Sequence, residues 1–334
     1  MFRTNPLGSL TRRVTFFHFG KPASTPCQST RSMASVTAFG PHSRLADDKP
    51  AFTYGTAWKK DQTKTLVKEA LKQGFRRVDT AAQPKHYQEH LVGEALREAY
   101  SEGIVSRESI YLQTKYTTPA GQDLSNMPYD PNAPLDTQIY TSVASSLNNL
   151  RTQEESTDGA HLDCLLLHSP LPTMEQTLEA WGLLETYVPH KIKALGISNV
   201  TLPVVREIYS SSTVKPSVVQ NRFYAQTGYD GPLRAFCRDR GITYQSFWTL
   251  TGNPKLLKSK PVLKLAQAAE VSVPTALYAL VMELGVEVLN GTTSAEHMQD
   301  DLDGVQKVRI WAVSNAREWS HFVRDFTLLT DSKV

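Results

Sequence analysis

The sequence predicts an α/β protein that folds as a single-domain (β/α)8 (TIM) barrel. From residue 51 onward, short apolar runs alternate with segments of helical period, and eight such pairs follow one another. The run Leu162–His168 is almost continuously hydrophobic, which is typical of a parallel strand buried on both faces. A length of 334 residues suits one barrel, and eight parallel strands favour closure of the sheet.

The expected strands are separated by segments with helical periodicity. Residues 65–72 place Leu66, Ala70 and Leu71 on one face of a helix, and Glu89–Glu102 repeats this pattern. The eight strands are expected at Phe52–Thr56, Arg76–Thr80, Ser109–Lys115, Leu162–His168, Ala194–Asn199, Ser217–Phe223, Thr243–Trp248 and Val286–Gly291.

The main structural competitor is an open, doubly wound sheet. Such a sheet normally carries a glycine-rich turn after its first strand to bind the phosphates of a nucleotide. The sequence contains no Gly-x-Gly-x-x-Gly motif. A nucleotide site must therefore be built from other residues.

Three segments are expected along the chain. Residues 1–46 contain six basic side chains and no acidic one, and they are rich in Ser and Thr. This composition is typical of a mitochondrial targeting peptide; the alternatives are a disordered extension on a cytoplasmic protein or a translation start at Met33. Residues 47–310 are expected to form the barrel, and residues 311–334 a C-terminal tail.

Composition argues against several classes of function. Without residues 1–46 the chain has 30 basic and 33 acidic residues, a net charge of −3, which argues against nucleic-acid binding. No run approaches the roughly 18 apolar residues that span a bilayer, so we expect no membrane partner. Cys27, Cys164 and Cys237 lack metal-ligand spacing, so we expect no metal site and a reducing compartment. Cys164 is expected to be a small core residue, with a catalytic thiol as the alternative.

Three ionisable residues end consecutive expected strands: Asp79, Lys115 and His168. Taken singly, the aspartate fits a turn cap, the lysine a solvated strand end and the histidine a hydrogen-bonded rim residue. In a barrel, however, the C-terminal ends of the strands meet at one face, where catalytic groups gather. An acid, a base and an imidazole at the same end of neighbouring strands therefore predict an active site.

These strand ends belong to a longer series of short motifs. The series is Val78–Ala82, Tyr87–Glu89, Val92–Ala95, Thr114-Lys115, Leu166–Pro170, Gly196–Asn199 and Val219-Gln220. In this order it resembles the aldo-keto reductase family, and the resemblance covers about residues 51–305. It implies a (β/α)8 barrel that binds NADP(H) in an extended pose without a Rossmann motif and reduces an aldehyde or ketone to an alcohol.

By this resemblance the catalytic residues are Asp79, Tyr87, Lys115 and His168. Tyr87 would donate the proton as hydride arrives, and the Lys115 ammonium would stabilise the phenolate and lower the tyrosine pKa from its ordinary value of about 10. Asp79 would hold the lysine, and a neutral His168 would orient the carbonyl. In the family the tyrosine follows the aspartate by five positions, but Tyr87 follows Asp79 by eight, which leaves His86 as an alternative acid.

The resemblance also implies which residues hold the nicotinamide. Ser198, Asn199 and Gln220 match the family's polar residues at the carboxamide, and their donors and acceptors suit an amide. Phe247 falls at the position of the family's stacking tyrosine, where a phenyl face can still stack. The alternative is that Phe247 is an ordinary core aromatic.

The adenosine end departs from the family. Where the family has a Lys-Ser pair and an arginine around the 2′-phosphate, this chain has Gly291, Thr292 and His297. Thr292 is expected to donate to the phosphate, and Asp301 resembles the residue that contacts adenine. Two charge-assisted phosphate contacts are thus lost. NADPH is the expected cofactor because of the resemblance alone, and NADH remains an alternative.

The substrate pocket is predicted from aromatic residues next to the strand ends. Trp58, Tyr116 and Trp248 would line it and would favour an apolar or aromatic carbonyl compound as the small-molecule partner. The loop over residues 116–136, with four prolines, is long for a βα connection and is expected to border the mouth. A monomer is favoured, but the sequence does not determine the oligomeric state.

Two other functions fit part of the sequence. A cofactor-binding regulatory or redox-sensing barrel with little turnover would explain the altered phosphate site. A metal-dependent barrel, such as a sugar isomerase, would use His168 together with carboxylates. The complete set of four catalytic residues favours the reductase over both.

Overall fold

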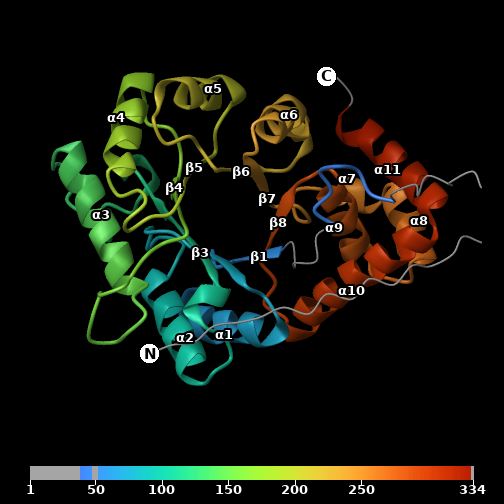
Figure 1. Cartoon of the computed structure of the whole chain (residues 1–334), viewed down its shortest axis with the longest axis horizontal. Helices are drawn as coiled ribbons and strands as arrows, with labels where there is room; N and C mark the ends of the chain where they lie inside the picture. Colours follow the sequence, from blue (N-terminus) through green and yellow to red (C-terminus); the bar gives the residue numbers. More distant parts are fainter. Residues whose placement is uncertain (1–37, 47–51, 332–334) are drawn as a thin grey trace, which may run out of the picture. The chain divides into compact units, whose positions relative to one another are not determined.

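The computed structural model describes residues 38–46 and 52–331. Its eight strands are all parallel and close into a barrel in their order along the chain (Figure 1). The expected (β/α)8 barrel is confirmed, and each strand lies within two residues of its expected ends. The strands are β1 (Phe52–Gly55), β2 (Arg77–Asp79), β3 (Tyr111–Tyr116), β4 (Cys164–Leu167), β5 (Leu195–Ser198), β6 (Val218–Arg222), β7 (Thr243–Phe247) and β8 (Glu287–Asn290).

Strand register brings polar strand ends to one rim of the barrel. β1 closes the sheet because Tyr54 lies opposite Val78 of β2 on one side and Asn290 of β8 on the other. Every residue of β4 and β5 is buried, as expected for parallel strands covered on both faces. Asp79, the last residue of β2, lies in register with Gln113 of β3. The carboxyl ends of neighbouring strands therefore lie side by side.

Helices connect the strands, and several begin or end at residues suited to that position. Ser272 and Ser294 accept backbone hydrogen bonds, each at 3.2 Å, and so cap two helix N-termini. Gly74 ends the first α-helix with φ of +114°. The helices are α1 (Thr63–Gln73), α2 (Glu89–Ser101), α3 (Leu135–Asn149), α4 (Met174–Glu185), α5 (Leu202–Ser211), α6 (Gly231–Asp239), α7 (Pro254–Leu257), α8 (Lys260–Ala268), α9 (Val273–Glu283), α10 (Ala295–Ser314) and α11 (Ala316–Thr330), with short 3-10 helices η1 (Lys60–Gln62), η2 (Arg107–Ser109), η3 (Pro119–Gly121) and η4 (Ala225–Asp230).

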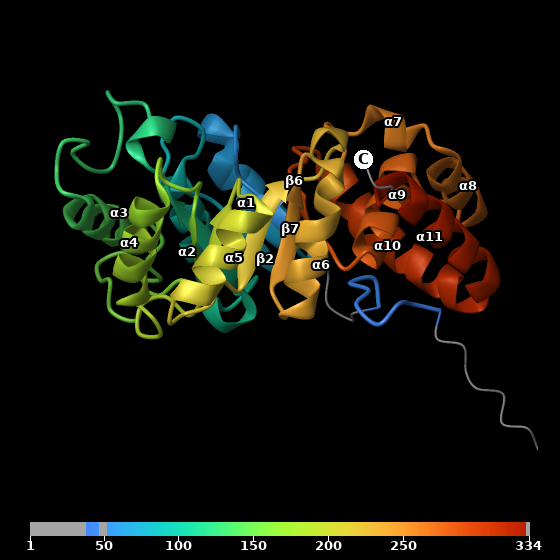
Figure 2. The same cartoon turned by 90° about the horizontal axis from the view of Figure 1, so that it is seen from above.

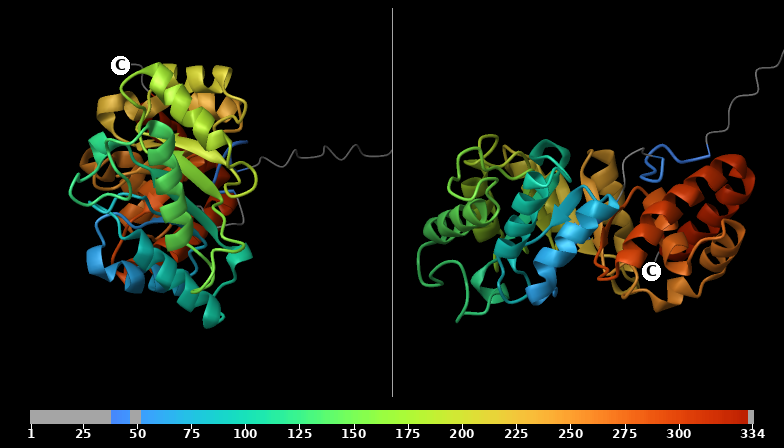
Figure 3. Two further views of the ribbon diagram at one scale, coloured as in Figure 1. Left: turned by 90° about the vertical axis from the view of Figure 1, so that its left-hand side faces the viewer. Right: turned by 90° about the horizontal axis from the view of Figure 1, so that it is seen from below.

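Residues 311–331 are part of the folded unit, which corrects the expected tail over residues 311–334 for the part of it that the structure describes. α10 runs across the expected boundary at residue 310, and α11 packs against α8 and α9 (Figure 2). Trp319 and Phe326 of α11 are fully buried, and Phe322 is 7% exposed. Their spacing of three and four residues gives α11 one apolar face. Figure 3 shows α10 and α11 on the side of the barrel away from α3 and α4.

Part of the expected N-terminal extension also packs on the barrel. Residues 1–37 lie outside the described residues, so targeting by residues 1–46 stays a prediction. Within residues 38–46, however, Leu45 is buried, the Arg44 amide donates to the Met282 carbonyl at 2.9 Å, and the Gly40 amide donates to Glu283 Oε1 at 2.8 Å. These residues therefore lie against the end of α9.

Two further expectations concern membranes and thiols. In the described part of the chain, no single helix is long and apolar enough to cross a membrane; α8 and α9 pass that test only as a pair bent by 110°. Cys27 lies outside the described residues. Cys164 and Cys237 are free and buried, and burial raises the pKa of Cys164 to about 12. Cys164 is therefore a small core residue with little thiolate at neutral pH.

Candidate active site

A cavity of about 950 Å³ opens at the C-terminal ends of the strands. In barrels of this kind the βα loops surround this end and build one shared site. Every strand except β3 contributes its last residues or the residues just after it to the wall, and the loop before α2 adds its own. Lining residues include Trp58, Asp79, Tyr87, His168, Ser198, Asn199, Gln220, Phe247, Trp248, Thr292, His297 and Asp301.

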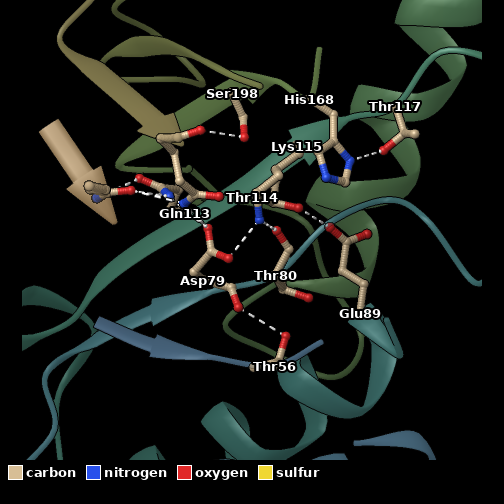
Figure 4. A network of polar contacts seen from close by, with 12 residues as sticks. Thr56, Asp79, Thr80, Glu89, Gln113, Thr114, Lys115, Thr117, His168 and Ser198 are labelled. Carbon is tan, nitrogen blue, oxygen red and sulfur yellow. Dashed lines mark hydrogen bonds and ion pairs between the residues drawn. The ribbon is translucent and has the colours of Figure 1, made fainter. Parts of the chain in front are cut away.

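Asp79, which lines this cavity, forms a buried ion pair with Lys115. Lys115 Nζ lies 2.6 Å from Asp79 Oδ2 and donates to the Thr80 carbonyl at 2.8 Å (Figure 4). The two side chains are only 1% and 2% exposed. Burial lowers the pKa of Lys115, but the Asp79 carboxylate and the neighbouring Tyr87 outweigh it, so that the pKa lies above its ordinary value. Lys115 is therefore an ammonium at neutral pH.

Tyr87 lies close to both this ammonium and His168. Lys115 Nζ is 5.0 Å from the centroid of the Tyr87 ring, and the Tyr87 and His168 ring centroids are 6.1 Å apart. Burial raises the pKa of the Tyr87 phenol, and the ammonium opposes that rise without reversing it. The expected net lowering of this pKa is thus wrong, since burial is the larger influence. Tyr87 carries its proton at neutral pH.

His168 is a neutral imidazole. Burial, with the Lys115 ammonium adding to it, lowers the pKa of His168 from 6.5 to about 3. Its Nδ1 lies 2.6 Å from Thr117 Oγ1 (Figure 4). This contact leaves Nε2 for a hydrogen bond to a ligand.

The residues expected at the nicotinamide lie on the same wall. Ser198 Oγ donates to the Gln220 carbonyl at 2.7 Å, and Asn199 Nδ2 donates to the His168 carbonyl at 2.9 Å. Gln220 Nε2 donates to Asp79 Oδ1 at 3.1 Å. Asn199 and Gln220 are therefore tied to His168 and Asp79, two of the four residues expected to be catalytic. Phe247, at the end of β7, lines the cavity beside them.

Comparison with known proteins identifies this arrangement. The sequence model described as the Aldo/keto reductase family matches residues 50–264. The chain belongs to the aldo/keto reductase family. The match covers seven of the eight strands and all four residues expected to be catalytic.

Characterised relatives of this aldo/keto reductase act on different substrates. The chain is 27% identical over 290 residues to the NAD(P)H-dependent 6'-deoxychalcone synthase of Glycine max, covering 78% of this chain and 84% of the relative. It is 28% identical to the NAD/NADP-dependent indole-3-acetaldehyde reductase of Schizosaccharomyces pombe, covering 80% and 88%. It is 27% identical to the methylglyoxal reductase DkgB of Escherichia coli O157:H7, covering 76% and 86%.

Solved structures show the same fold. A Bombyx mori aldo-keto reductase in complex with NADP superposes with a TM-score of 0.61 at 19% identity, covering 78% of this chain and 89% of that one. An aldo/keto reductase from Brucella melitensis superposes with a TM-score of 0.60 at 22% identity, covering 78% and 95%.

The far end of the reductase cavity contains a cation that sequence analysis missed. Lys59, seven percent exposed, donates from Nζ to the Gly291 carbonyl, next to Thr292. Burial lowers the pKa of Lys59 to about 8, so that the amine is mostly charged at neutral pH. Lys59 lies four residues beyond the end of β1, outside the strand ends from which the catalytic candidates were chosen. Asp301 lines this end, but its oxygens already accept from Asn290 at 2.8 Å and Thr275 at 3.2 Å.

Two of the three residues expected in the substrate pocket line the cavity. Trp58 and Trp248 are 65% and 51% exposed, and both take left-handed backbone angles, with φ of 64° and 58°. The Trp58 ring stacks on His86 with centroids 3.8 Å apart, and Arg222, also missed from sequence, lies 4.4 Å from the Trp248 ring. Trp58 and Trp248 therefore form an exposed aromatic rim along part of the cavity.

Tyr116 is the exception and corrects the third pocket assignment. Its side chain is 1% exposed, stacks on Tyr129 with centroids 5.7 Å apart and donates to Gln138 Oε1 at 3.3 Å. Successive residues of a strand point to opposite faces, so Tyr116 points to the helix layer when Lys115 points inward.

The loop over residues 116–136 does not line the reductase cavity either. Asn126 and Pro128 instead border a separate pocket of about 240 Å³ that shares Gln83 and Tyr87 with the cavity. The loop is tied to the segment before Tyr87, because Gln122 Nε2 donates to the Ala82 carbonyl at 2.8 Å. The loop therefore contacts the segment before Tyr87 rather than the reductase cavity.

Proposed function

We propose that this protein is an NADPH-dependent reductase that converts an aldehyde or ketone to the alcohol, with Tyr87 as the proton donor. The observation that carries the proposal is the meeting of Tyr87, His168 and Asp79 in a single cavity, with Lys115 paired to Asp79 and 5.0 Å from the centroid of the Tyr87 ring. The names of the relatives, which include two aldehyde reductases, support the same reaction.

The four residues divide the proton chemistry among them. His168 Nε2 donates a hydrogen bond to the carbonyl oxygen and fixes its position, as a neutral imidazole can. Tyr87 transfers its phenolic proton to that oxygen as negative charge develops on it. The phenolate left behind is stabilised by the Lys115 ammonium, and Asp79 keeps this ammonium in place.

The cavity wall fits a nicotinamide dinucleotide. Ser198, Asn199 and Gln220 offer hydroxyl and amide groups suited to the carboxamide, and Phe247 offers a flat face. When bound, NADPH supplies the hydride that adds to the carbonyl carbon. Lys59, together with Thr292 and His297, provides the positive charge and donors for phosphate at the other end of the cavity.

The aromatic rim supports a substrate class. Trp58 and Trp248 present large apolar faces at the mouth, close to Tyr87 and His168 in the same cavity. Apolar or aromatic carbonyl compounds bury most surface against such faces. Indole-3-acetaldehyde, the substrate named for one relative, is a compound of this class.

Oxidation of NADPH by the full chain tests this function. We expect turnover that requires an added carbonyl compound, with indole-3-acetaldehyde preferred in kcat/KM over methylglyoxal, and no loss of rate with a metal chelator. Tight NADPH binding without turnover on any aldehyde or ketone would support the regulatory barrel instead. Loss of activity with the chelator would favour a metal-dependent barrel.

A further inference from the structure

Three glutamines lie inside the barrel beneath the catalytic residues. Gln113 of β3 and Gln245 of β7 are fully buried, and Gln220 of β6 is 3% exposed. Barrel interiors are commonly filled by branched apolar side chains, and a buried amide is stabilised only if its polar atoms are hydrogen-bonded. A polar interior of this kind therefore requires each donor and acceptor to be paired.

Carboxylates at two points of this network fix the orientation of the amides. Asp79 Oδ1 accepts from Gln113 Nε2 at 2.6 Å and from Gln220 Nε2 at 3.1 Å. Glu287 Oε1 accepts from Gln245 Nε2 at 2.9 Å and pairs with Arg77 at 3.1 Å. Because an ionised carboxylate only accepts hydrogen bonds, each glutamine must turn its NH2 group toward it.

The orientation of the Gln245 amide in turn fixes the orientation of the Gln220 amide. With its nitrogen facing Glu287, Gln245 presents Oε1 to Gln220 Nε2 at 3.0 Å and to Gln113 Nε2 at 2.9 Å. Both N–H groups of Gln220 are then used, one on Asp79 and one on Gln245. Reversing the Gln220 amide would set its oxygen against two acceptor oxygens.

One atom of the Gln220 amide is left for a ligand. Among residues 38–46 and 52–331, Gln220 Oε1 has no hydrogen-bond partner, and Gln220 lines the cavity. The cavity wall therefore presents an acceptor at this point. A ligand group that donates, such as a carboxamide NH2, satisfies this oxygen, whereas a carboxylate faces it with a second acceptor.

We propose that Gln245 is a positioning residue that makes the cavity select a carboxamide over a carboxylate on the dinucleotide ring, by holding Oε1 of Gln220 toward the ligand. This inference rests on the proposed function, because it places the nicotinamide at Gln220. Gln113, which donates to both Asp79 and Gln245, supports the same orientation from β3.

Binding constants for two dinucleotides test the inference. The ligands are NADP+ and its nicotinic acid analogue, which has a carboxylate in place of the carboxamide, and the fluorescence of the cavity residues Trp58 and Trp248 reports binding. Gln245→Met keeps the side-chain length but removes both the carbonyl oxygen and the NH2 group of the amide. Gln138→Met is the matched control, since Gln138 is a buried glutamine on α3 whose partners lie outside the network.

We expect wild type and Gln138→Met to prefer NADP+ by roughly tenfold, and Gln245→Met to prefer it by less than about threefold. An unchanged preference in a folded Gln245→Met protein would overturn the inference. If that variant does not fold, Gln113→Met gives the same test. Its preference for NADP+ should fall below that of wild type, and an equal preference would overturn the inference. Failure of wild type to bind NADP+ or reduce any carbonyl would instead overturn the proposed function.

Discussion

His168 illustrates how one side chain acquires its catalytic state from its surroundings. Packing at the end of β4 removes the imidazole from water, and the positive charge of Lys115 further disfavours its protonation. The pKa of His168 therefore falls to about 3. A histidine that stays neutral can donate a hydrogen bond to a carbonyl across the physiological pH range. The same lowered pKa makes the stability of the folded protein depend on pH, which unfolding measurements can detect.

The pH dependence of stability tests the state of His168. The unfolded chain binds a proton at this histidine below pH 6.5, while the folded chain does so only near pH 3. Stability therefore falls as pH decreases through this window, by up to about 1.4 kcal/mol per pH unit. We expect the free energy of unfolding of His168→Gln to fall less steeply than that of wild type between these pH values. Parallel slopes for the two proteins would contradict a neutral His168.

Lys59 is a residue whose charge changes within an accessible pH range. Its contact with the Gly291 carbonyl places it beside Thr292, where the resemblance implies a phosphate site but this chain lacks the Lys-Ser pair. Because burial lowers its pKa to about 8, its positive charge is lost as pH rises past that value. The affinity for a phosphate-bearing ligand should follow this charge.

We therefore predict that NADPH binding weakens as pH rises through 8 and above in wild type. Lys59→Met should bind roughly tenfold more weakly at pH 7, as expected for loss of one charge-assisted contact, and should show no further weakening over that range. Fluorescence titration at a series of pH values measures both. A pH dependence that persists in Lys59→Met would exclude this residue as its source.

At the scale of elements, hydrophobic patterning predicted every strand but not every strand end. Residues 162–168 read as one strand, yet β4 covers only Cys164–Leu167. Leu162 forms an isolated bridge with Ile192, and His168 leaves the strand to line the cavity. Both residues are at the ends of an apolar run, where composition alone does not distinguish pairing from turning away. For Tyr116, by contrast, the alternation of side chains along a strand predicts correctly that it points away from the barrel interior when Lys115 points inward.

The contact between α2 and α3 depends on a glycine of the family motif. A Cβ atom on Gly93 would lie 1.8 Å from the Asn149 carbonyl oxygen, at the end of α3. α2 begins at Glu89, two residues after Tyr87, so its position also sets the position of the catalytic segment. The glycine is therefore required by close packing, which a single sequence does not reveal.

We predict that Gly93→Ala lowers the free energy of unfolding by roughly 1–3 kcal/mol or more, because the helices must move apart. Gly182→Ala is the matched control, since Gly182 lies in α4 with no atom within 4 Å of its added Cβ, and it should be neutral or stabilising. Chemical denaturation measures both. Equal effects at the two glycines would contradict the close approach.

At the scale of the whole molecule, the convergence of the site was predictable only in part. Asp79, Lys115 and His168 lie at or next to the ends of successive strands, and barrel topology alone brings such ends together. Contacts such as Lys59 with Gly291, or Gly40 with Glu283, join residues 232 and 243 positions apart. No local pattern carries this information, so the cation at the phosphate end and the packing of residues 38–46 emerged only from the structure.

The kcat of Tyr87→Phe, measured beside that of His86→Gln, distinguishes Tyr87 from His86 as the proton donor. His86 precedes Tyr87 and lines the same cavity, but its ring stacks on Trp58, and the Lys115 ammonium lies near Tyr87. With Tyr87 as the acid, Tyr87→Phe should lower kcat by roughly 10²- to 10⁴-fold with NADPH affinity retained, while His86→Gln should stay within about tenfold of wild type. Wild-type turnover in Tyr87→Phe, with activity lost in His86→Gln, would contradict the assignment of Tyr87 as the proton donor.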